Sequence, residues 1–234
     1  MKLCVIGGAG ARSAFLTKSL VKAAGDIRVD EIVLMDNDRE KLRTYGEISK
    51  ELARRLDPQL KFWVTADAEA ALRDVDYIIT TIRAGGDAGR LFDEKTCLAH
   101  GVLGQETTGA GGFAMALRSV PALVYYCTLA RKVAHPGHLI FTFTTPSGII
   151  TQALRSRGFD NVYGICDAPS GFIKQLEEIL DVPYGELDIE CYGLNHLSWF
   201  RNARLHGRDV QRELLDNPRT YQHSEMRLFT RELA

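Results

Sequence analysis

The pattern of apolar and polar positions predicts a strand, a tight turn, a helix and a second strand at the start of the chain. Leu3 to Ile6 is a short apolar run that ends in the glycines of GGAGA, and the residues from Ser13 onward carry apolar side chains at helical spacing. The next apolar run, Glu31 to Asp36, ends in an acid. Because a glycine turn joins the first strand to the helix, we expect a βαβ unit here.

The same alternation of strands and helices continues along the chain. Strands are expected where apolar residues are continuous or alternate with polar ones, and helices where they recur every three or four positions. The expected strands are 61–65, 75–82, 138–148 (which runs into a turn) and 161–167, and the expected helices are 38–55, 68–72, 114–134 and 149–157. The residues Arg83 to Lys95, RAGGDAGRLFDEK, are expected to form a loop that reaches a ligand at the carboxyl end of the sheet.

This order predicts an α/β fold in two parts. Alternating strands and helices produce a doubly wound parallel sheet of the Rossmann type, which we expect over residues 1–165. A helix at 173–180, a strand at 187–192, a hairpin turning at His206-Gly207 and two polar helices up to Ala234 follow. Residues 166–234 are therefore expected to form a second part of the α+β kind.

The glycine turn and the acid after the second strand predict a dinucleotide site. In a βαβ unit, glycines such as Gly7, Gly8 and Gly10 let the backbone approach a diphosphate at a helix N-terminus, and an acid placed like Asp36 binds the adenosine ribose. The pattern is imperfect, because Ser13 stands where a third glycine is usual. The alternative is a turn that binds no nucleotide, with Asp36 capping the next helix.

Composition and charge narrow the class of protein. The chain has 234 residues, a formal net charge of −1, 45% hydrophobic residues and 25% charged residues. We therefore expect neither a nucleic-acid partner nor a membrane, since the charges are mixed and no apolar run approaches the length of a span. The first strand follows Met1 at once, so no signal peptide is expected and the cytoplasm is the expected location. Five cysteines without a CxxC pair disfavour a disulfide framework or a structural zinc site.

A thiol and an imidazole carry the candidate chemistry. Cys166 lies in GICDAPSG and His196 in GLNHLSW, each just past an expected strand. A thiolate and an imidazole suit a divalent transition metal, and two protein ligands leave positions open for substrate oxygens. The alternatives are a buried free cysteine with a capping histidine, or a Cys–His nucleophile pair. Asp167 is either a base at the metal or a helix N-cap, and Glu106 either tunes a catalytic group or stabilises a helix terminus.

Six segments together resemble one family. They occur in the same order from Leu3 to Trp199: GGAGA, RLFDEK, GVLGQETTGAGG, TTPSGIITQA, GICDAPSG and YGLNHLSW. The chain resembles glycoside hydrolase family 4, which comprises NAD- and manganese-dependent 6-phospho-α- and 6-phospho-β-glucosidases and their α-galactosidase and α-glucuronidase relatives. That family looks like the lactate and malate dehydrogenases. The resemblance therefore implies that residues 1–165 bind NAD and that residues 166–234 are the opening part of an α+β domain of their kind, which binds substrate and metal.

The resemblance also implies roles for individual residues. It implies that Cys166 and His196 ligate the metal and that Asp167 is the acid/base. Glu106 would raise the basicity of a catalytic tyrosine. The implied substrate contacts are Arg90 with the sugar phosphate, together with Thr145 and Asn195. Thr142 and Thr145 stand where the family has asparagines, and a hydroxyl cannot both donate and accept as an amide does, so the identity of the substrate is left open.

The implied reaction is hydrolysis of a phosphorylated glycoside without net redox change. It begins with hydride transfer from sugar C3 to NAD, continues with metal-assisted elimination and water addition, and ends with return of the hydride. The resemblance further implies a dimer or tetramer. It covers only the N-terminal half of the family, without the tyrosine segment, so we expect these residues to bind NAD more readily than to turn over substrate. The alternatives are an NAD-dependent dehydrogenase of a small hydroxy acid or sugar acid, and an inactive nucleotide-binding remnant.

Overall fold

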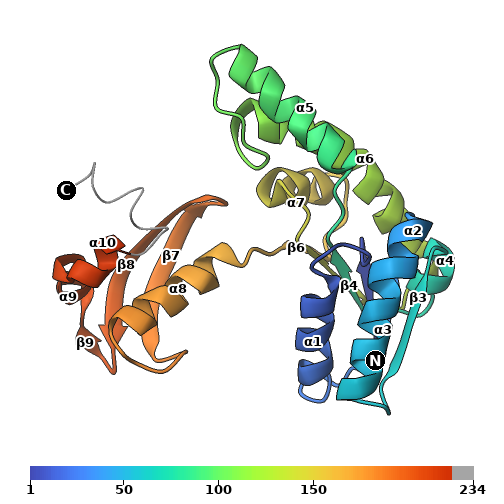
Figure 1. The fold of residues 1–234 in the computed structure, drawn as a ribbon, viewed down its shortest axis with the longest axis horizontal. Helices are drawn as coiled ribbons and strands as arrows, with labels where there is room; N and C mark the ends of the chain where they lie inside the picture. The colour runs from blue at the N-terminus through green and yellow to red at the C-terminus, as the bar shows by residue number, and fades with distance from the viewer. Residues whose placement is uncertain (223–234) are drawn as a thin grey trace. The chain divides into compact units, whose positions relative to one another are not determined.

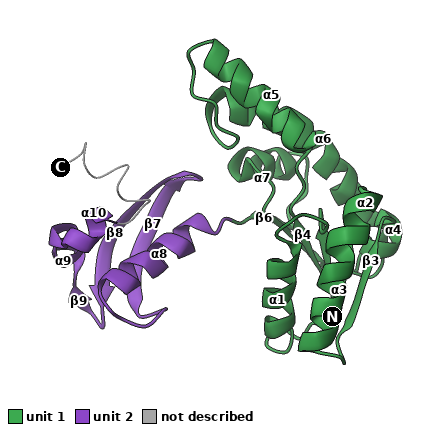
Figure 2. Cartoon of the chain, in the orientation of Figure 1, with its two compact units in different colours: residues 1–165 green, residues 166–234 purple. Residues whose placement is uncertain are grey.

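The chain divides into two compact units. The structure is a computed structural model that describes residues 1–222. Unit 1 is Met1–Ile165 and unit 2 begins at Cys166 (Figure 2). Each unit has its own core of buried apolar side chains, so each is described by itself.

Unit 1 is built on one parallel sheet. The sheet has six strands in the order β3-β2-β1-β4-β5-β6, of which β3, β4 and β6 are labelled in Figure 1. The order reverses between β1 and β4, which is the switch point where doubly wound sheets bind their ligands. The strands are β1 (Lys2–Ile6), β2 (Glu31–Met35), β3 (Lys61–Thr65), β4 (Tyr77–Thr80), β5 (Leu139–Thr142) and β6 (Val162–Gly164).

Helices cover both faces of this sheet. Alternate residues of β1 point to opposite faces, so Leu3 and Val5 pack with residues of α1 and α3, while Cys4 and Ile6 lie in the cluster with α4, α6 and α7. The expected doubly wound α/β fold is therefore confirmed for unit 1. Its helices are α1 (Ser13–Ala23), α2 (Arg39–Lys41), the π-helix η1 (Leu42–Gly46), α3 (Glu47–Leu56), α4 (Ala68–Leu72), α5 (Gly86–Ala99), α6 (Gly109–Val133) and α7 (Ser147–Arg155).

The segment expected to be a loop after β4 is mostly helix. Helix α5 starts at Gly86, so the prediction of a loop over residues 83–95 is wrong beyond its first residues. The glycines suggested a loop, but Gly85 and Gly89 make room for the side chain of Arg118: a Cβ on them would lie 3.0 and 3.4 Å from its guanidinium. Arg118 donates to the carbonyl oxygen of Ala84 and to Asp93, which ties the start of α5 to α6.

Helix α6 is long and apolar. Among the helices of residues 1–222 it is the one that could cross a membrane by length and composition alone, which corrects the expectation that no apolar stretch reaches that length. Its side chains Leu123, Cys127 and Ala130 are buried in the core of unit 1. A core helix meets the same criterion as a membrane span, and 33% of the apolar window of α6 is buried inside the structure.

Unit 2 is a small α+β structure. An antiparallel sheet in the order β7-β8-β9 packs against α8, around the buried side chains of Leu176, Ile179, Leu187 and Ala203. The expected turn at His206-Gly207 joins β8 to β9, and both residues have positive φ. The rest of the expected polar helix up to Ala234 lies outside the described residues. The elements are α8 (Ala168–Ile179), β7 (Leu187–Leu194), β8 (Leu197–Leu205), β9 (Arg208–Asp209), α9 (Gln211–Asp216) and α10 (Pro218–Gln222).

Candidate functional site

The glycine turn after β1 is fixed by close packing. Gly7 has φ +86°, and a Cβ there would lie 2.8 Å from backbone atoms of Thr81 and Ile82. A Cβ on Gly8 would lie 2.8 Å from Cβ of Leu34. The amides of Gly7 and Gly8 both donate to the carbonyl oxygen of Met35, at 2.9 Å. Only glycine fits these two positions, because a side chain has no room at either one. Gly7 in addition has a left-handed backbone conformation, which is strained for other residues.

Asp36 holds the same turn from the end of β2. One carboxylate oxygen accepts a hydrogen bond from the amide of Ala9 at 3.2 Å, and the other accepts from the amide of Asp38 at 3.0 Å. The side chain that caps the next helix is Asp38, which accepts from the amide of Lys41. Asp36 therefore braces the glycine turn, whereas the alternative had given it the capping role.

Gly10 leaves an open face on the turn. A Cβ on Gly10 would have no atom within 4 Å. Within the described part of the chain, the amides of Gly10 and Ala11 donate to no protein acceptor, although they sit just before helix α1. Free backbone donors and open space at a helix N-terminus suit a diphosphate. The turn therefore fits the predicted nucleotide.

Glu106 lies between two arginines of unit 1. Its carboxylate oxygens are 2.6 Å from Nη1 of Arg83 and 3.5 Å from Nη1 of Arg90. Arg90 also donates through Nε to Glu94 at 2.7 Å, and this hydrogen bond raises the pKa of the Arg90 guanidinium. The structure thus brings together Glu106 and Arg90, two of the predicted site residues. It adds Arg83, which the sequence analysis did not select as a site residue although it directly follows the expected strand 75–82.

Glycines also shape the loop that carries Glu106. A Cβ on Gly104 would lie 2.6 Å from the carbonyl oxygen of Glu94, and one on Gly111 would lie 2.5 Å from that of Gln105. The side-chain oxygen of Gln105 accepts from the amide of Thr108 at 2.7 Å. The loop between α5 and α6 is therefore tightly packed, which holds Glu106 against the arginines.

Cys166 and His196 lie together in unit 2. The sulfur of Cys166 is 3.7 Å from Nε2 of His196. Cys166 stands just before α8, and His196 is in the two-residue turn between β7 and β8, where its φ is +60°. In a tetrahedral zinc site, metal–sulfur and metal–nitrogen bonds of about 2.3 and 2.1 Å place the two donor atoms about 3.6 Å apart. The pair therefore fits one divalent ion, and no group of three metal-binding side chains occurs among residues 1–222.

Two more predicted residues lie beside this pair in the chain. Asp167 occupies the N-cap position of α8, but its side chain makes no capping hydrogen bond and is exposed. Asn195 is the other residue of the β7–β8 turn. The third predicted substrate contact, Thr145, belongs to unit 1 and precedes Pro146 through a cis peptide bond. Asp167 is thus free of the structural role that was its alternative.

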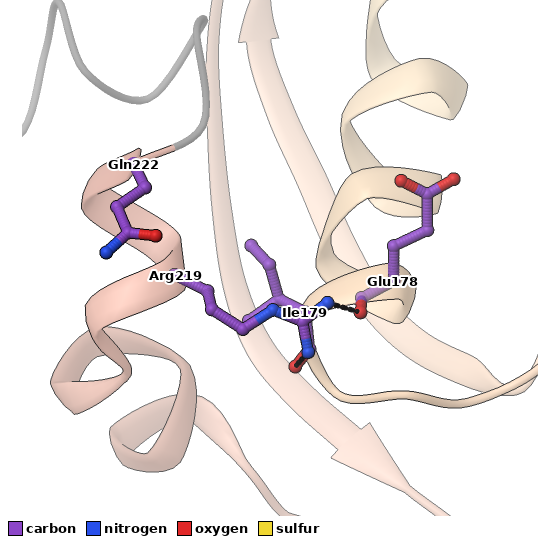
Figure 3. A pocket seen from close by; sticks show the side chains of 4 residues that line it. All are labelled: Glu178, Ile179, Arg219 and Gln222. Atoms are coloured by element: carbon purple, nitrogen blue, oxygen red, sulfur yellow. Dashed lines mark hydrogen bonds between the residues drawn. The ribbon is translucent and has the colours of Figure 1, made fainter.

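A hollow on unit 2 contains none of the predicted site residues. It is lined by Glu178, Ile179, Arg219 and Gln222 (Figure 3). The guanidinium of Arg219 donates to the carbonyl oxygens of Glu178 and Ile179, at 2.6 and 3.0 Å. Because these are carbonyls at the end of α8, Arg219 stabilises a helix C-terminus here.

Comparison with known proteins identifies the family. The model of the family described as family 4 glycosyl hydrolase matches residues 2–182. The chain belongs to glycosyl hydrolase family 4. This confirms the resemblance, and the match contains the glycine turn, Glu106 and Cys166. His196 lies beyond it.

Family 4 relatives act on both anomers. The phospho-α-glucosidase PagL of Clostridium acetobutylicum is 36% identical over 203 residues, which are 85% of this chain and 45% of that protein. The structure of the 6-phospho-β-glucosidase of Thermotoga maritima with manganese, NAD+ and glucose-6-phosphate is similar with a TM-score of 0.85 and 34% identity, over 93% of this chain and 53% of that one. The chain spans about half the length of the curated relatives it matches.

The family 4 fold extends to the dehydrogenases. Lactate dehydrogenase of Eimeria maxima is similar with a TM-score of 0.65 over 91% of this chain and 60% of that one, at 12% identity. Identity this low shows the fold alone. It confirms the expected order of a Rossmann-type sheet followed by the start of an α+β domain like that of the lactate and malate dehydrogenases.

Proposed function

We propose that this chain carries the NAD- and metal-binding residues of a family 4 glycosidase that hydrolyses 6-phosphoglycosides. The observation that carries the proposal is the 3.7 Å separation of the Cys166 sulfur and the His196 nitrogen. A dehydrogenase of the lactate type has no need of a thiolate and imidazole held at this distance, whereas a metal-dependent elimination does. Membership of family 4 supports the same reading.

The glycine turn is the proposed NAD site. The free amides of Gly10 and Ala11 would donate to the diphosphate, and the carboxylate of Asp36 would accept from the adenosine ribose. Asp36 can accept from the ribose and still accept the hydrogen bond from the amide of Ala9, because the lone pairs of a carboxylate can accept from several donors. NAD, when bound, supplies reversible acceptance of a hydride. The assignment of residues 1–165 to NAD and of residues 166–234 to metal and substrate is part of this proposal.

Cys166 and His196 are the proposed ligands of a divalent metal such as manganese. The metal, when bound, supplies positive charge next to the sugar oxygens. The exposed carboxylate of Asp167 is free to accept or return a proton at the hydroxyl side of the substrate. Asn195, in the same turn as His196, would orient the sugar through its amide.

Glu106 and Arg90 are the proposed unit 1 contributions to catalysis. Arg83 and Arg90 hold the Glu106 carboxylate in place, where it would raise the basicity of a neighbouring phenol. Arg90 would contact the phosphate of the substrate by exchanging its carboxylate partners, and Thr145 would contact the sugar. Similar proteins solved with glucose-6-phosphate support a phosphorylated sugar as the substrate. A cytoplasmic location and a dimer or tetramer complete the proposal.

Two binding measurements and two activity measurements on the purified 234-residue chain test the proposal. Calorimetric titration with NAD should show one site, and electron paramagnetic resonance should show Mn²⁺ bound at one per chain. Absorbance at 340 nm separates the glycosidase from the dehydrogenase alternative, since only the latter accumulates NADH with substrate. We expect NAD and Mn²⁺ binding with weak or no release of nitrophenol from nitrophenyl 6-phosphoglucosides. A chain that binds neither NAD nor Mn²⁺ would refute the proposal.

A further inference from the structure

The glycine turn is held by a side chain that the sequence analysis did not select. Thr81 is the first residue after β4, and its hydroxyl donates a hydrogen bond of 2.9 Å to the carbonyl oxygen of Gly7. Its amide donates to the carbonyl oxygen of Ile6 at 2.8 Å. The end of β4 is therefore bonded to the exit of β1 through both its main chain and its side chain.

The Thr81 hydroxyl donates to a carbonyl oxygen that the sheet does not pair. The last paired residues of β1 and β4 are Ile6 and Thr80, so the carbonyl of Gly7 lies beyond the ladder. Among residues 1–222, the Thr81 hydroxyl is the donor that bonds to the carbonyl oxygen of Gly7. Without that donor a partly buried carbonyl loses its partner, and the Gly7–Gly8 peptide is held only by the hydrogen bond from the Gly8 amide to the carbonyl of Met35. The amides of Gly10 and Ala11 lie two and three peptides further along the same turn.

We infer that Thr81 is a positioning residue for NAD. Its hydroxyl fixes the peptide that opens the turn, while Asp36 fixes the amide of Ala9 two residues later. Together they aim the free amides of Gly10 and Ala11 at one point, as a diphosphate requires. This inference rests on the proposed function, because it assigns a further residue to the same NAD site.

Substitution of Thr81 by valine tests the inference, because valine keeps the shape and removes the hydroxyl. A matched control is Thr151→Val: the Thr151 hydroxyl is also part-buried in unit 1 and donates to a backbone carbonyl, that of Ser147, at 2.7 Å. We expect Thr81→Val to weaken NAD binding about 3- to 10-fold, the loss of one neutral hydrogen bond. Thr81→Ser should restore the affinity to within about 2-fold, since serine keeps the donor. Thr151→Val should bind NAD as the unaltered chain does.

Calorimetry with NAD separates the outcomes. The inference is overturned if Thr81→Val binds NAD as tightly as the unaltered chain. It is also overturned if Thr151→Val loses as much NAD affinity as Thr81→Val, or if Thr81→Ser does not restore the NAD affinity. If Thr81→Val does not melt cooperatively, Thr81→Ala replaces it in the same comparison. If the unaltered chain binds no NAD, the proposed function fails. Amide hydrogen exchange of residues 7–12 then still tests whether the Thr81 hydroxyl restrains the backbone of the glycine turn. Exchange that is no faster in the valine variant would then overturn it.

Discussion

The sulfur of Cys166 and the Nε2 nitrogen of His196 lie 3.7 Å apart, although they come from a helix start and a hairpin turn. The positive φ of His196 turns the chain so that the imidazole meets the thiol. Replacing either residue removes one of two protein donors to the proposed metal. We expect Cys166→Ser and His196→Ala each to lower the affinity for Mn²⁺ by at least about 10-fold, measured by electron paramagnetic resonance of the bound ion.

Cys191 provides the control for this experiment. It is an exposed thiol on β7 of the same unit, so Cys191→Ser tests the loss of a thiol away from the proposed metal. Its Mn²⁺ affinity should equal that of the unaltered chain. Unchanged Mn²⁺ binding in both Cys166→Ser and His196→Ala would refute the assignment of the ligands.

The glycine turn allows structure and binding to be separated. Gly7→Ala places a Cβ 2.8 Å from the backbone of Thr81 at a φ of +86°, so we expect a loss of about 2 kcal/mol or more in the free energy of unfolding. Gly10→Ala meets no atom within 4 Å and should change that free energy by less than about 0.5 kcal/mol. The added methyl would nevertheless lie where the diphosphate approaches, and we expect NAD affinity to fall about 10-fold or more.

Urea unfolding and calorimetry with NAD check both variants. Wild-type NAD affinity in a stable Gly10→Ala chain would contradict the placement of the diphosphate. A Gly7→Ala chain as stable as the unaltered one would contradict the packing described for the turn.

The sheet of unit 1 could be predicted from the sequence because its signals are local. Each strand is a short run of apolar residues, and buried parallel strands show this pattern clearly. The loop predicted over residues 83–95 failed for a non-local reason. Gly85 and Gly89 are small because Arg118, from the next helix, occupies the adjacent space. No spacing in the segment itself records that contact.

The candidate site was predicted in part. The glycine turn and Asp36 follow β1 and β2, so their position at the carboxyl edge of the sheet of unit 1 could be inferred from topology. Cys166 and His196 could each be placed just past an expected strand. The sequence did not indicate Arg83 or Thr81, because their roles depend on partners in other segments. Arg83 pairs with Glu106, and Thr81 bonds to the carbonyl of Gly7. Contacts of this kind become visible only once the strands are paired.

The ion pair of Arg118 and Asp93 should be a main support of helix α5. The Asp93 side chain is only 6% exposed, and both of its oxygens accept from the guanidinium. Asp93→Asn leaves the Arg118 guanidinium, whose side chain is 31% exposed, without its counterion, so we expect a loss of about 1 to 2 kcal/mol in the free energy of unfolding. An exposed pair is the control: Glu51→Gln, which removes the partner of Arg54 and Arg55 on α3, should shift the urea midpoint far less.

Fluorescence can follow unit 1 separately in this test. The chain has two tryptophans, Trp63 in β3 and Trp199 in β8, so a Trp199→Phe background leaves a reporter in unit 1 alone. Equal urea midpoints of Asp93→Asn and the unaltered background would show that the pair contributes nothing net.

Two buried thiols make unit 1 sensitive to alkaline pH. Burial raises the pKa of Cys4 to about 12 and that of Cys127 to about 12, from 9.0 for each thiol in the unfolded chain. Because the folded state keeps the proton longer, their contribution is fully present below pH 9 and is lost as the pH rises toward 12. Each thiol should therefore lower the free energy of unfolding by up to about 1.4 kcal/mol per pH unit across this window.

Cys127→Ala isolates one of these thiols. The smaller side chain lowers the free energy of unfolding by the same amount at every pH. Between pH 9 and 12, however, the free energy of unfolding of the variant should fall less steeply than that of the unaltered chain, with slopes that differ by up to about 1.4 kcal/mol per pH unit. Cys191→Ala, at an exposed thiol, should leave the slope unchanged. The measurement is urea unfolding at several pH values in the Trp199→Phe background. The free energy of unfolding depends on pH only where the folded and unfolded states bind different numbers of protons. If Cys127→Ala and the unaltered chain show the same slope of this free energy against pH, ionisation of Cys127 is not coupled to folding.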